Sequence, residues 1–188
     1  MLFGRVSATA ATKLEPMDTV DWPDSVQRVR RRLAHLGYEG EVTMLAESAR
    51  SAQQAADAVG AEVGAIAKAI IFRRSGDDVP VLVITSGANR VDIAKVEELV
   101  GEVGKADAAY VRERTGFAIG GVSPIGMDPD AVVLFDEDLT RFDTVWAAAG
   151  HPNSVFEATP AQLAAYAGAR VEDIGVDDIG VDDGESDD

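Results

Sequence analysis

A lysine inside an otherwise apolar segment is the first residue whose type and position suggest chemistry. Lys68 interrupts the run Ala65-Ile-Ala-Lys-Ala-Ile-Ile-Phe72, and no other lysine occurs between Lys13 and Lys95. A strand lysine in such a place must extend its ammonium to solvent or direct it into a polar cleft. The second arrangement would supply a fixed cation for binding or catalysis. The residues alone leave both interpretations open.

A glycine-rich loop is the second candidate. The segment Gly120-Gly-Val-Ser-Pro-Ile-Gly126 holds three glycines and one proline. It is typical of a tight turn with positive φ angles. It is equally typical of a loop whose backbone N–H groups converge on an anion or a developing oxyanion. Ser123 offers a hydroxyl, but no base is recognisable beside it, so the backbone role is the preferred functional interpretation.

Other catalytic or metal-binding sets are scarce in this sequence. Cysteine is absent and only two histidines occur, His35 and His151. This excludes thiolate zinc sites, Fe–S clusters and cysteine nucleophiles, so no metal and no cofactor are expected. His151 follows Gly150 in an expected loop, as a candidate site residue or an ordinary surface side chain. No Gly-x-Ser-x-Gly, Walker or His-Glu-x-x-His motif is present.

Basic residues gather in two places, Arg28 to Arg32 and Arg73-Arg74. Arg28, Arg31 and Arg32 can share one helix face. Such a cluster either contacts phosphates or balances neighbouring acids at the surface, and the sequence does not separate the two.

The composition limits the classes of protein to which the chain can belong. It has 188 residues, 46% of them hydrophobic, which suits one domain with a sizeable core. With 17 basic and 33 acidic residues the net charge is -16, which argues against a general DNA-binding protein. No run of 18 apolar residues and no signal-peptide pattern occurs, so we expect no membrane contact and a cytoplasmic location.

The charge pattern divides the chain into three parts. We expect residues 1–20 to be a flexible extension, 21–173 the folded domain, and 174–188 an acidic, disordered tail. The last 18 residues carry nine acids and no base, and they contain the repeat Ile-Gly-Val-Asp-Asp. The tail could bind a cation or a partner, but a solvated end is the favoured interpretation. We therefore expect removal of residues 175–188 to leave folding and catalysis unchanged.

Hydrophobic periodicity, caps and turns predict the elements that position these candidates. Helices are predicted by the spacing of apolar residues, by capping boxes at Ser51 and Thr159, and by glycines that follow the apolar segments. The predicted helices span 24–36, 52–59, 89–100 and 160–167, with a short element at 107–114. In the helix 89–100, Ile93, Val96, Leu99 and Val100 are expected inward. Apolar, β-branched runs predict strands at 41–45, 65–73, 79–85, 131–135, 145–149, 154–158 and 169–173. A hairpin through Ser75–Asp78 favours a mixed α/β sheet over a parallel one.

The order of motifs resembles a known family. The matching segments are Ser51-Ala-Gln-Gln-Ala-Ala56, Lys68-Ala-Ile-Ile-Phe72, Val81-Leu-Val-Ile84, Asn89-Arg-Val-Asp-Ile-Ala-Lys95, Thr115-Gly116, the loop 120–126, Val133-Leu-Phe-Asp136 and Ala149-Gly150. Together they resemble the YbaK and prolyl-tRNA-synthetase-associated domain family, relatives of the editing domain of bacterial prolyl-tRNA synthetases. A lysine followed some fifty residues later by Gly-x-x-x-Pro is the most specific part.

The resemblance implies a mixed, partly barrel-like β-sheet flanked by helices. It also implies hydrolysis of the ester that joins a wrong amino acid to the terminal adenosine of a tRNA. Lys68 would hold the substrate end, and the Gly-x-x-x-Pro loop would border the aminoacyl group through Gly120, Gly121, Val122, Ser123 and Pro124. Asp136 and Gly150 match positions near the cleft, with His151 adjacent, and are expected to bind substrate.

The implied partners are the acceptor end of an aminoacyl-tRNA and an aminoacyl-tRNA synthetase. Ala69 departs from the polar residue that follows the lysine in alanine- and cysteine-directed relatives, which leaves the amino-acid specificity open. Two alternatives stay open as well. One is a catalytically silent module of the same fold that binds tRNA ends, nucleotides or a synthetase, and the other is hydrolysis of a small ester other than tRNA.

Overall fold

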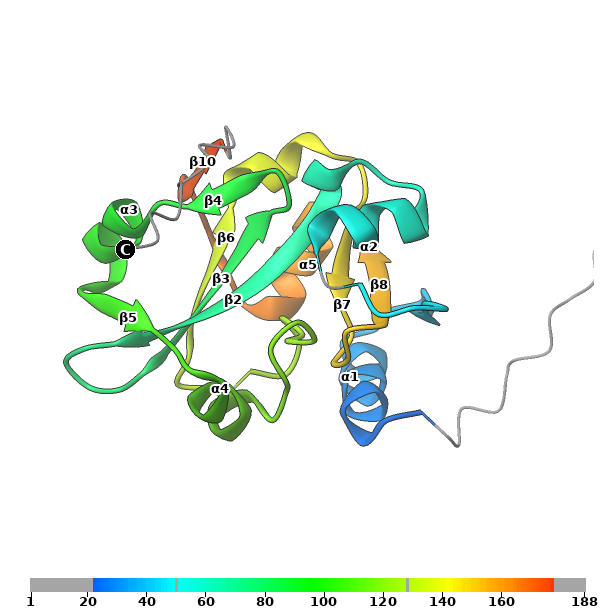
Figure 1. Cartoon of the computed structure of the whole chain (residues 1–188), viewed down its shortest axis with the longest axis horizontal. Helices are drawn as coiled ribbons and strands as arrows, with labels where there is room; N and C mark the ends of the chain where they lie inside the picture. Colours follow the sequence, from blue (N-terminus) through cyan, green and yellow to red (C-terminus); the bar gives the residue numbers. More distant parts are fainter. Residues whose placement is uncertain (1–21, 50, 128, 178–188) are drawn as a thin grey trace, which may run out of the picture.

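The computed structural model describes residues 22–49, 51–127 and 129–177 (Figure 1). Its helices are α1 (Asp24–His35), α2 (Ala52–Val59), α3 (Ile93–Val100), α4 (Ala108–Thr115) and α5 (Pro160–Ala167), with 3₁₀ helices η2 (Val63–Ala65) and η3 (Glu137–Arg141). Its strands are β1 (Val42–Met44), β2 (Ile66–Arg74), β3 (Pro80–Ser86), β4 (Asn89–Val91), β5 (Val103–Lys105), β6 (Val132–Asp136), β7 (Val145–Ala148), β8 (Ser154–Ala158), β9 (Arg170–Glu172) and β10 (Gly175–Asp177). The expected N-terminal extension lies outside these residues.

The main sheet is mixed, as predicted. Its strands run in the order β1-β8-β7-β2-β3-β6-β9, and β5 pairs with β2 beside this path. β2 pairs antiparallel with β3 through the predicted hairpin, whereas it pairs parallel with β7 on its other side. Within the described residues β1 and β9 form the two ends of the path, so the sheet curves without closing into a complete barrel.

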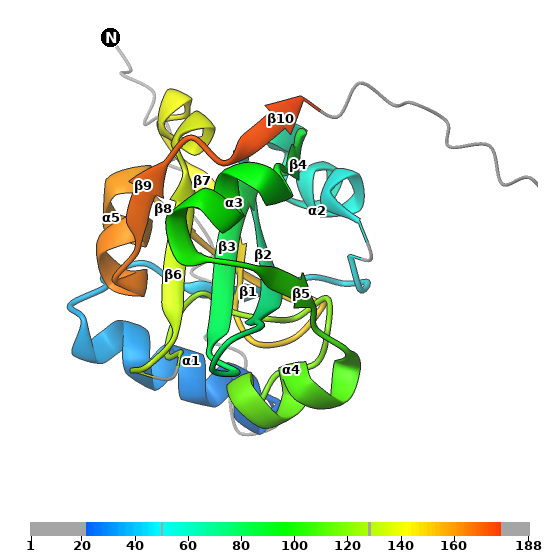
Figure 2. The same ribbon diagram turned by 90° about the vertical axis from the view of Figure 1, so that its left-hand side faces the viewer.

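The helices form where the sequence supplies caps. The Ser51 hydroxyl accepts the Gln54 amide at the start of α2, and Thr159 with Gln162 forms the capping box of α5. Gly60 and Gly168 end these helices in the left-handed conformation, which glycine adopts without strain. In the turned view α1 and α4 lie at one end of the sheet, and α3 lies near β4 and β10 at the other (Figure 2).

The segment 89–100 differs from its prediction as a single helix. Asn89–Val91 forms β4, and α3 begins only at Ile93 because the Asp92 side chain caps it by accepting the Lys95 amide. Ile93 and Leu99 were expected inward, but they are 39% and 37% exposed. Only Val96 on this helix is fully buried, so the apolar face is narrower than the periodicity indicated.

The fold also extends past the expected start of the acidic tail. Ile174 is fully buried against Val81, Val83 and Leu134, and Gly175–Asp177 pairs antiparallel with β4. Residues 174–177 are therefore part of the folded domain. The rest of the expected tail lies outside the described residues.

The largest core cluster lies between the sheet and helices α1, α4 and α5. Its fully buried members include Leu33, Leu82, Phe117, Phe135 and Phe156. Burial of such side chains is the main favourable contribution to folding, at about 1.5–3 kcal/mol each. The smaller clusters lie under α2 and under α3. In the described part of the chain, no helix has the length and apolarity required to cross a bilayer.

Candidate active site

Lys68 lies on the wall of a small cavity. It is part-buried in β2 opposite Thr85 of β3. The cavity encloses about 180 Å³. It is lined by β2, α2, the β7–β8 hairpin and the loop after α4, through residues that include Ala52, Ala55, Ile66, Lys68, Gly120, Val122, Trp146, Pro152 and Val155. Lys68 is the one charged side chain among the described residues that line it.

The position of the Lys68 ammonium is fixed by a backbone carbonyl. Lys68 Nζ donates to the carbonyl oxygen of Asn89, at 2.6 Å, where β4 begins. The Asn89 side chain is buried, and its Nδ2 donates to Asp136 Oδ2 at 2.9 Å and to Asp138 Oδ2 at 2.7 Å. The lysine is thus connected through one residue to the end of β6.

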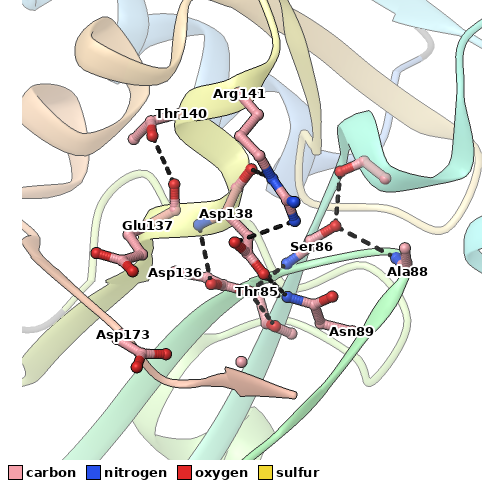
Figure 3. A network of polar contacts seen from close by, with 12 residues as sticks. Thr85, Ser86, Ala88, Asn89, Asp136, Glu137, Asp138, Thr140, Arg141 and Asp173 are labelled. Atoms are coloured by element: carbon pink, nitrogen blue, oxygen red, sulfur yellow. Dashed lines mark hydrogen bonds and ion pairs between the residues drawn. The ribbon is translucent and has the colours of Figure 1, made fainter. Parts of the chain in front are cut away.

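Asp136 lies behind the lysine rather than on the cavity wall. It is 1% exposed, and its Oδ2 also accepts Thr85 Oγ1 and the Ser86 amide, at 2.9 and 3.1 Å. Its Oδ1 accepts the Asp138 amide (Figure 3). The four donors satisfy the hydrogen-bonding capacity of this carboxylate although it is buried away from water. The structure therefore gives Asp136 the position of an internal support.

The glycine-rich loop contributes Gly120 and Val122 to the lining of the same cavity. Gly120 has φ +87°, as expected for such a turn, and the Gly121 amide donates to Ala118 O at 3.0 Å. The amides of Val122 and Ser123 have no acceptor among the residues that the structure describes. Pro124 has no N–H. Val122 and Ser123 thus present two adjacent backbone donors that the described fold does not use.

The loop is held by its packing against the hairpin that joins β7 and β8. A Cβ on Gly121 would lie 2.8 Å from the His151 Cα and carbonyl carbon and 2.9 Å from Pro152 Cδ. A Cβ on Gly150 would lie 2.8 Å from Ser25 O of α1. Both glycines permit close backbone approach, so the two loops and α1 form one packed unit beside the cavity.

The two side chains with nucleophilic or basic character near the loop are engaged elsewhere. Ser123 is fully buried, and its Oγ accepts the Ile125 amide at 3.2 Å. His151 is half-buried, and its Nδ1 contacts the Asn153 side chain. Neither residue is among those that line the cavity, whereas the neighbouring Pro152 is.

The basic cluster on α1 is partly structural. Arg28 donates to Thr115 O at 3.0 Å, and its guanidinium lies 4.4 Å from the centre of the Phe117 ring. Arg30 lies 4.8 Å from the Trp22 ring centre. Arg73 and Arg74 form ion pairs with Asp78 and Asp77 of the hairpin turn. Arg28 therefore ties α1 to the segment that leads into the glycine-rich loop.

Of the predicted site residues, the structure brings Lys68, Gly120 and Val122 together around one cavity. Gly121, Ser123, Pro124, Gly150 and His151 form the packed support of the loop, and Asp136 supports Asn89. Sequence reasoning missed Asn89 and Trp146. The sequence indicated Asn89 as a possible site residue, since it begins one of the segments that match the family, but the residue was assigned to a helix. In the described residues no three His, Cys, Asp or Glu side chains are grouped as metal ligands would be.

Comparison with known proteins shows the family to which this chain belongs. The aminoacyl-tRNA editing domain matches residues 46–166, which include the cavity strand, the loop and the β7–β8 hairpin. The chain belongs to the aminoacyl-tRNA editing domain family. The resemblance inferred from Lys68 and the Gly-x-x-x-Pro loop is thereby confirmed, and so is the mixed fold.

Two relatives are similar to this chain over most of its length. The uncharacterized protein YwhH of Bacillus subtilis (strain 168) is 34% identical over 148 residues, which cover 78% of this chain and 94% of YwhH. A solved protein proposed to be a trans-editing enzyme for prolyl-tRNA synthetase is 43% identical, with a TM-score of 0.77. That match covers 82% of this chain and 98% of the solved one. Each match thus spans nearly the whole length of the relative.

Proposed function

We propose that this editing domain acts in trans to hydrolyse the ester bond of a mischarged aminoacyl-tRNA. The observation that carries the proposal is the cavity that Lys68 lines together with the loop residues Gly120 and Val122. Family membership supports a role on aminoacyl-tRNA. The solved relative named as a trans-editing enzyme supports action on tRNA that a synthetase has charged.

Lys68 would supply positive charge at the reacting end of the substrate. An aminoacyl ester is already activated, so attack by water requires mainly positioning and stabilisation of the oxyanion. The ammonium, held in place by Asn89 O, would contact the ester carbonyl oxygen or the neighbouring phosphate. Because the cavity wall is otherwise uncharged, this interaction would be stronger than in open water.

The backbone of the loop would provide the second contact to the oxyanion. Val122 lines the cavity, and the amides of Val122 and Ser123 are without an acceptor in the described structure. Two adjacent N–H groups of this kind can bind a developing negative charge without reorganisation. The Ser123 hydroxyl accepts the Ile125 amide within the turn, and Ser123 is not among the residues that line the cavity.

The proposed reaction needs no covalent intermediate. Water adds to the ester carbonyl carbon, the bond to the ribose oxygen breaks, and that oxygen leaves with a proton. The proton that water loses passes to a ribose hydroxyl of the substrate or through an ordered water. The products are the free amino acid and a tRNA with a free 3′ end.

A substitution at Ser123 separates this mechanism from a covalent one. We expect Ser123→Ala to keep more than about a third of the wild-type rate, because the loss is one turn hydrogen bond of about 1 kcal/mol in stability. The measurement is the rate of amino-acid release from a mischarged tRNA, with folding checked by circular dichroism. An inactive, folded variant together with an accumulating acyl-enzyme would show that Ser123 is the nucleophile.

The acidic character of the chain limits how it would bind tRNA. With a net charge of -16, contact would be confined to a small area at the acceptor end, and binding would be weak and salt-sensitive. A synthetase partner would raise the local concentration of charged tRNA. We place this activity in the cytoplasm, where charged tRNA is found.

The experiment that tests the proposal is a deacylation screen. Purified full-length protein is incubated with a panel of tRNAs, each charged with a labelled wrong amino acid, and release of the label is followed over time. A catalytic rate with at least one tRNA supports the proposal. Binding of tRNA without release from any of them would favour the catalytically silent module, and release from small esters alone would favour a different substrate.

A further inference from the structure

The C-terminal strand β10 covers the residues that hold Lys68. It pairs antiparallel with β4, with Gly175 opposite Val91 and Asp177 opposite Asn89. Figure 2 shows β10 lying along β4 at one end of the molecule. The strand lies beyond residue 166, where the match to the editing-domain family ends. It is therefore a feature of this chain that the family match does not account for.

Several contacts fix β10 in this position. Ile174 is fully buried, and its carbonyl accepts the Asp92 amide at 2.9 Å. Lys95 Nζ donates to Asp173 Oδ1 at 2.7 Å and to Gly175 O at 3.2 Å. The Asp173 carboxylate raises the pKa of Lys95, so this cation stays charged through the physiological range. The strand is thus attached to α3 as well as to β4.

Gly175 makes the closest approach to the buried polar network. A Cβ at this position would lie 2.3 Å from Asn89 Nδ2 and 2.7 Å from Asp136 Oδ2. Both atoms belong to the network in which Asn89 joins Asp136 and Asp138 (Figure 3). Only glycine allows the strand to pack directly on this amide, so any larger residue must displace the network or the strand.

Strand β10 is connected to Lys68 through one residue, Asn89. Gly175 packs on the Asn89 side chain, and the backbone carbonyl of the same asparagine accepts the Lys68 ammonium at 2.6 Å. A shift of Asn89 would therefore move the acceptor that fixes the cation. A displacement of about 1 Å at a reacting group can lower a rate by as much as 10²-fold.

We propose that β10 is a positioning element of the active site, which sets the place of the Lys68 ammonium by packing Gly175 against Asn89. The inference rests on the proposed function for its catalytic consequence. Asn89 and Gly175 are positioning residues, because neither lines the cavity and both act through Lys68. The expectation that all of residues 175–188 are dispensable is accordingly replaced: residues 175–177 are required for full activity.

The test compares two substitutions in the same strand. Gly175→Ala introduces the Cβ that meets Asn89, whereas Val176→Ala trims a side chain that is 49% exposed. We expect Gly175→Ala to lower kcat about tenfold or more while KM for the tRNA changes less than about twofold. We expect Val176→Ala to leave both constants unchanged. Equal constants in Gly175→Ala and the wild type would overturn the proposal.

A second measurement does not depend on enzymatic activity. The rate at which a water-soluble acylating reagent labels each lysine of the folded protein is followed by mass spectrometry. We expect the labelling rate of Lys68 to change at least about threefold in Gly175→Ala, with Lys105 as the internal reference. If the wild type releases no amino acid from any tRNA, the proposed function fails, and the labelling rates alone decide whether β10 positions Lys68.

Two truncated chains keep the proposal testable if Gly175→Ala does not fold. A chain ending at Ile174 keeps the buried isoleucine but lacks β10, and a chain ending at Asp177 keeps β10. The first should show the kcat and labelling changes of Gly175→Ala, and the second should match the wild type. If both Gly175→Ala and the chain ending at Ile174 unfold, the strand serves the fold as a whole and the positioning proposal is wrong.

Discussion

Replacing Lys68 by alanine should reduce deacylation of the preferred mischarged tRNA by about 10²-fold or more while the protein stays folded. The reason is that the substitution removes the one charged side chain on the described cavity wall. Loss of a single group that stabilises an oxyanion commonly costs 10²–10³ in rate. The measurement is the initial rate of amino-acid release at saturating tRNA, with circular dichroism as the check on folding.

Lys105→Ala is the matched control for this variant. Lys105 is exposed on β5 and is not among the residues that line the cavity of Lys68, so its removal changes the net charge equally and leaves the lining of that cavity intact. We expect this variant to retain the wild-type kcat. Equal losses in the two variants would mean that lysine acts only through general attraction of tRNA, and a fully active Lys68→Ala would remove Lys68 from the mechanism.

The second large effect is expected at Gly121. Valine at this position would place its Cβ 2.8 Å from the His151 backbone, and backbone cannot move aside as a flexible side chain can. The loop must then shift away from the β7–β8 hairpin, which carries the Val122 and Ser123 amides off their target. We expect a loss of about 10²-fold in kcat, the scale found when one oxyanion donor is misplaced. The check is the same release assay.

The physical reason at Gly121 is steric rather than conformational. Gly120 has a positive φ, whereas Gly121 lies outside the left-handed region, so a β-branched residue is excluded by the neighbouring loop. Gly76→Val is a suitable control, because a Cβ there meets nothing within 4 Å. Wild-type activity in Gly121→Val, with a native spectrum, would show that the position of this loop does not govern the rate.

Local signals in the sequence predicted much of the fold. The caps at Ser51 and Thr159 and the hairpin through Ser75–Asp78 each depend on residues close together in the chain, and all three occur as predicted. Lys68 stood out for the same reason, since a charge within an apolar strand is visible without knowledge of its neighbours. The cavity that it lines contains Gly120 and Val122 of the predicted loop.

The errors concern contacts between distant short segments. β4 and β10 have three residues each, and their closest residues, Val91 and Gly175, lie 84 positions apart in the sequence, so no local pattern marks their pairing. Residues 174–177 looked like the start of a solvated tail because acids surround them, yet Ile174 fills a core position. The expected binding of substrate by Asp136 stays a prediction, and only the arrangement of Thr85, Ser86 and Asn89 around it reveals that its carboxylate is also an internal support.

Deacylation by this editing domain is measured most directly as the single-turnover rate of amino-acid release with the protein in excess over tRNA. Each mischarged tRNA is compared with the same tRNA carrying its correct amino acid and with a sample lacking protein. We expect at least one mischarged tRNA to lose its amino acid about 10²-fold faster than without protein, while the correctly charged tRNA does not. Release at the spontaneous rate from every tRNA tested would contradict it.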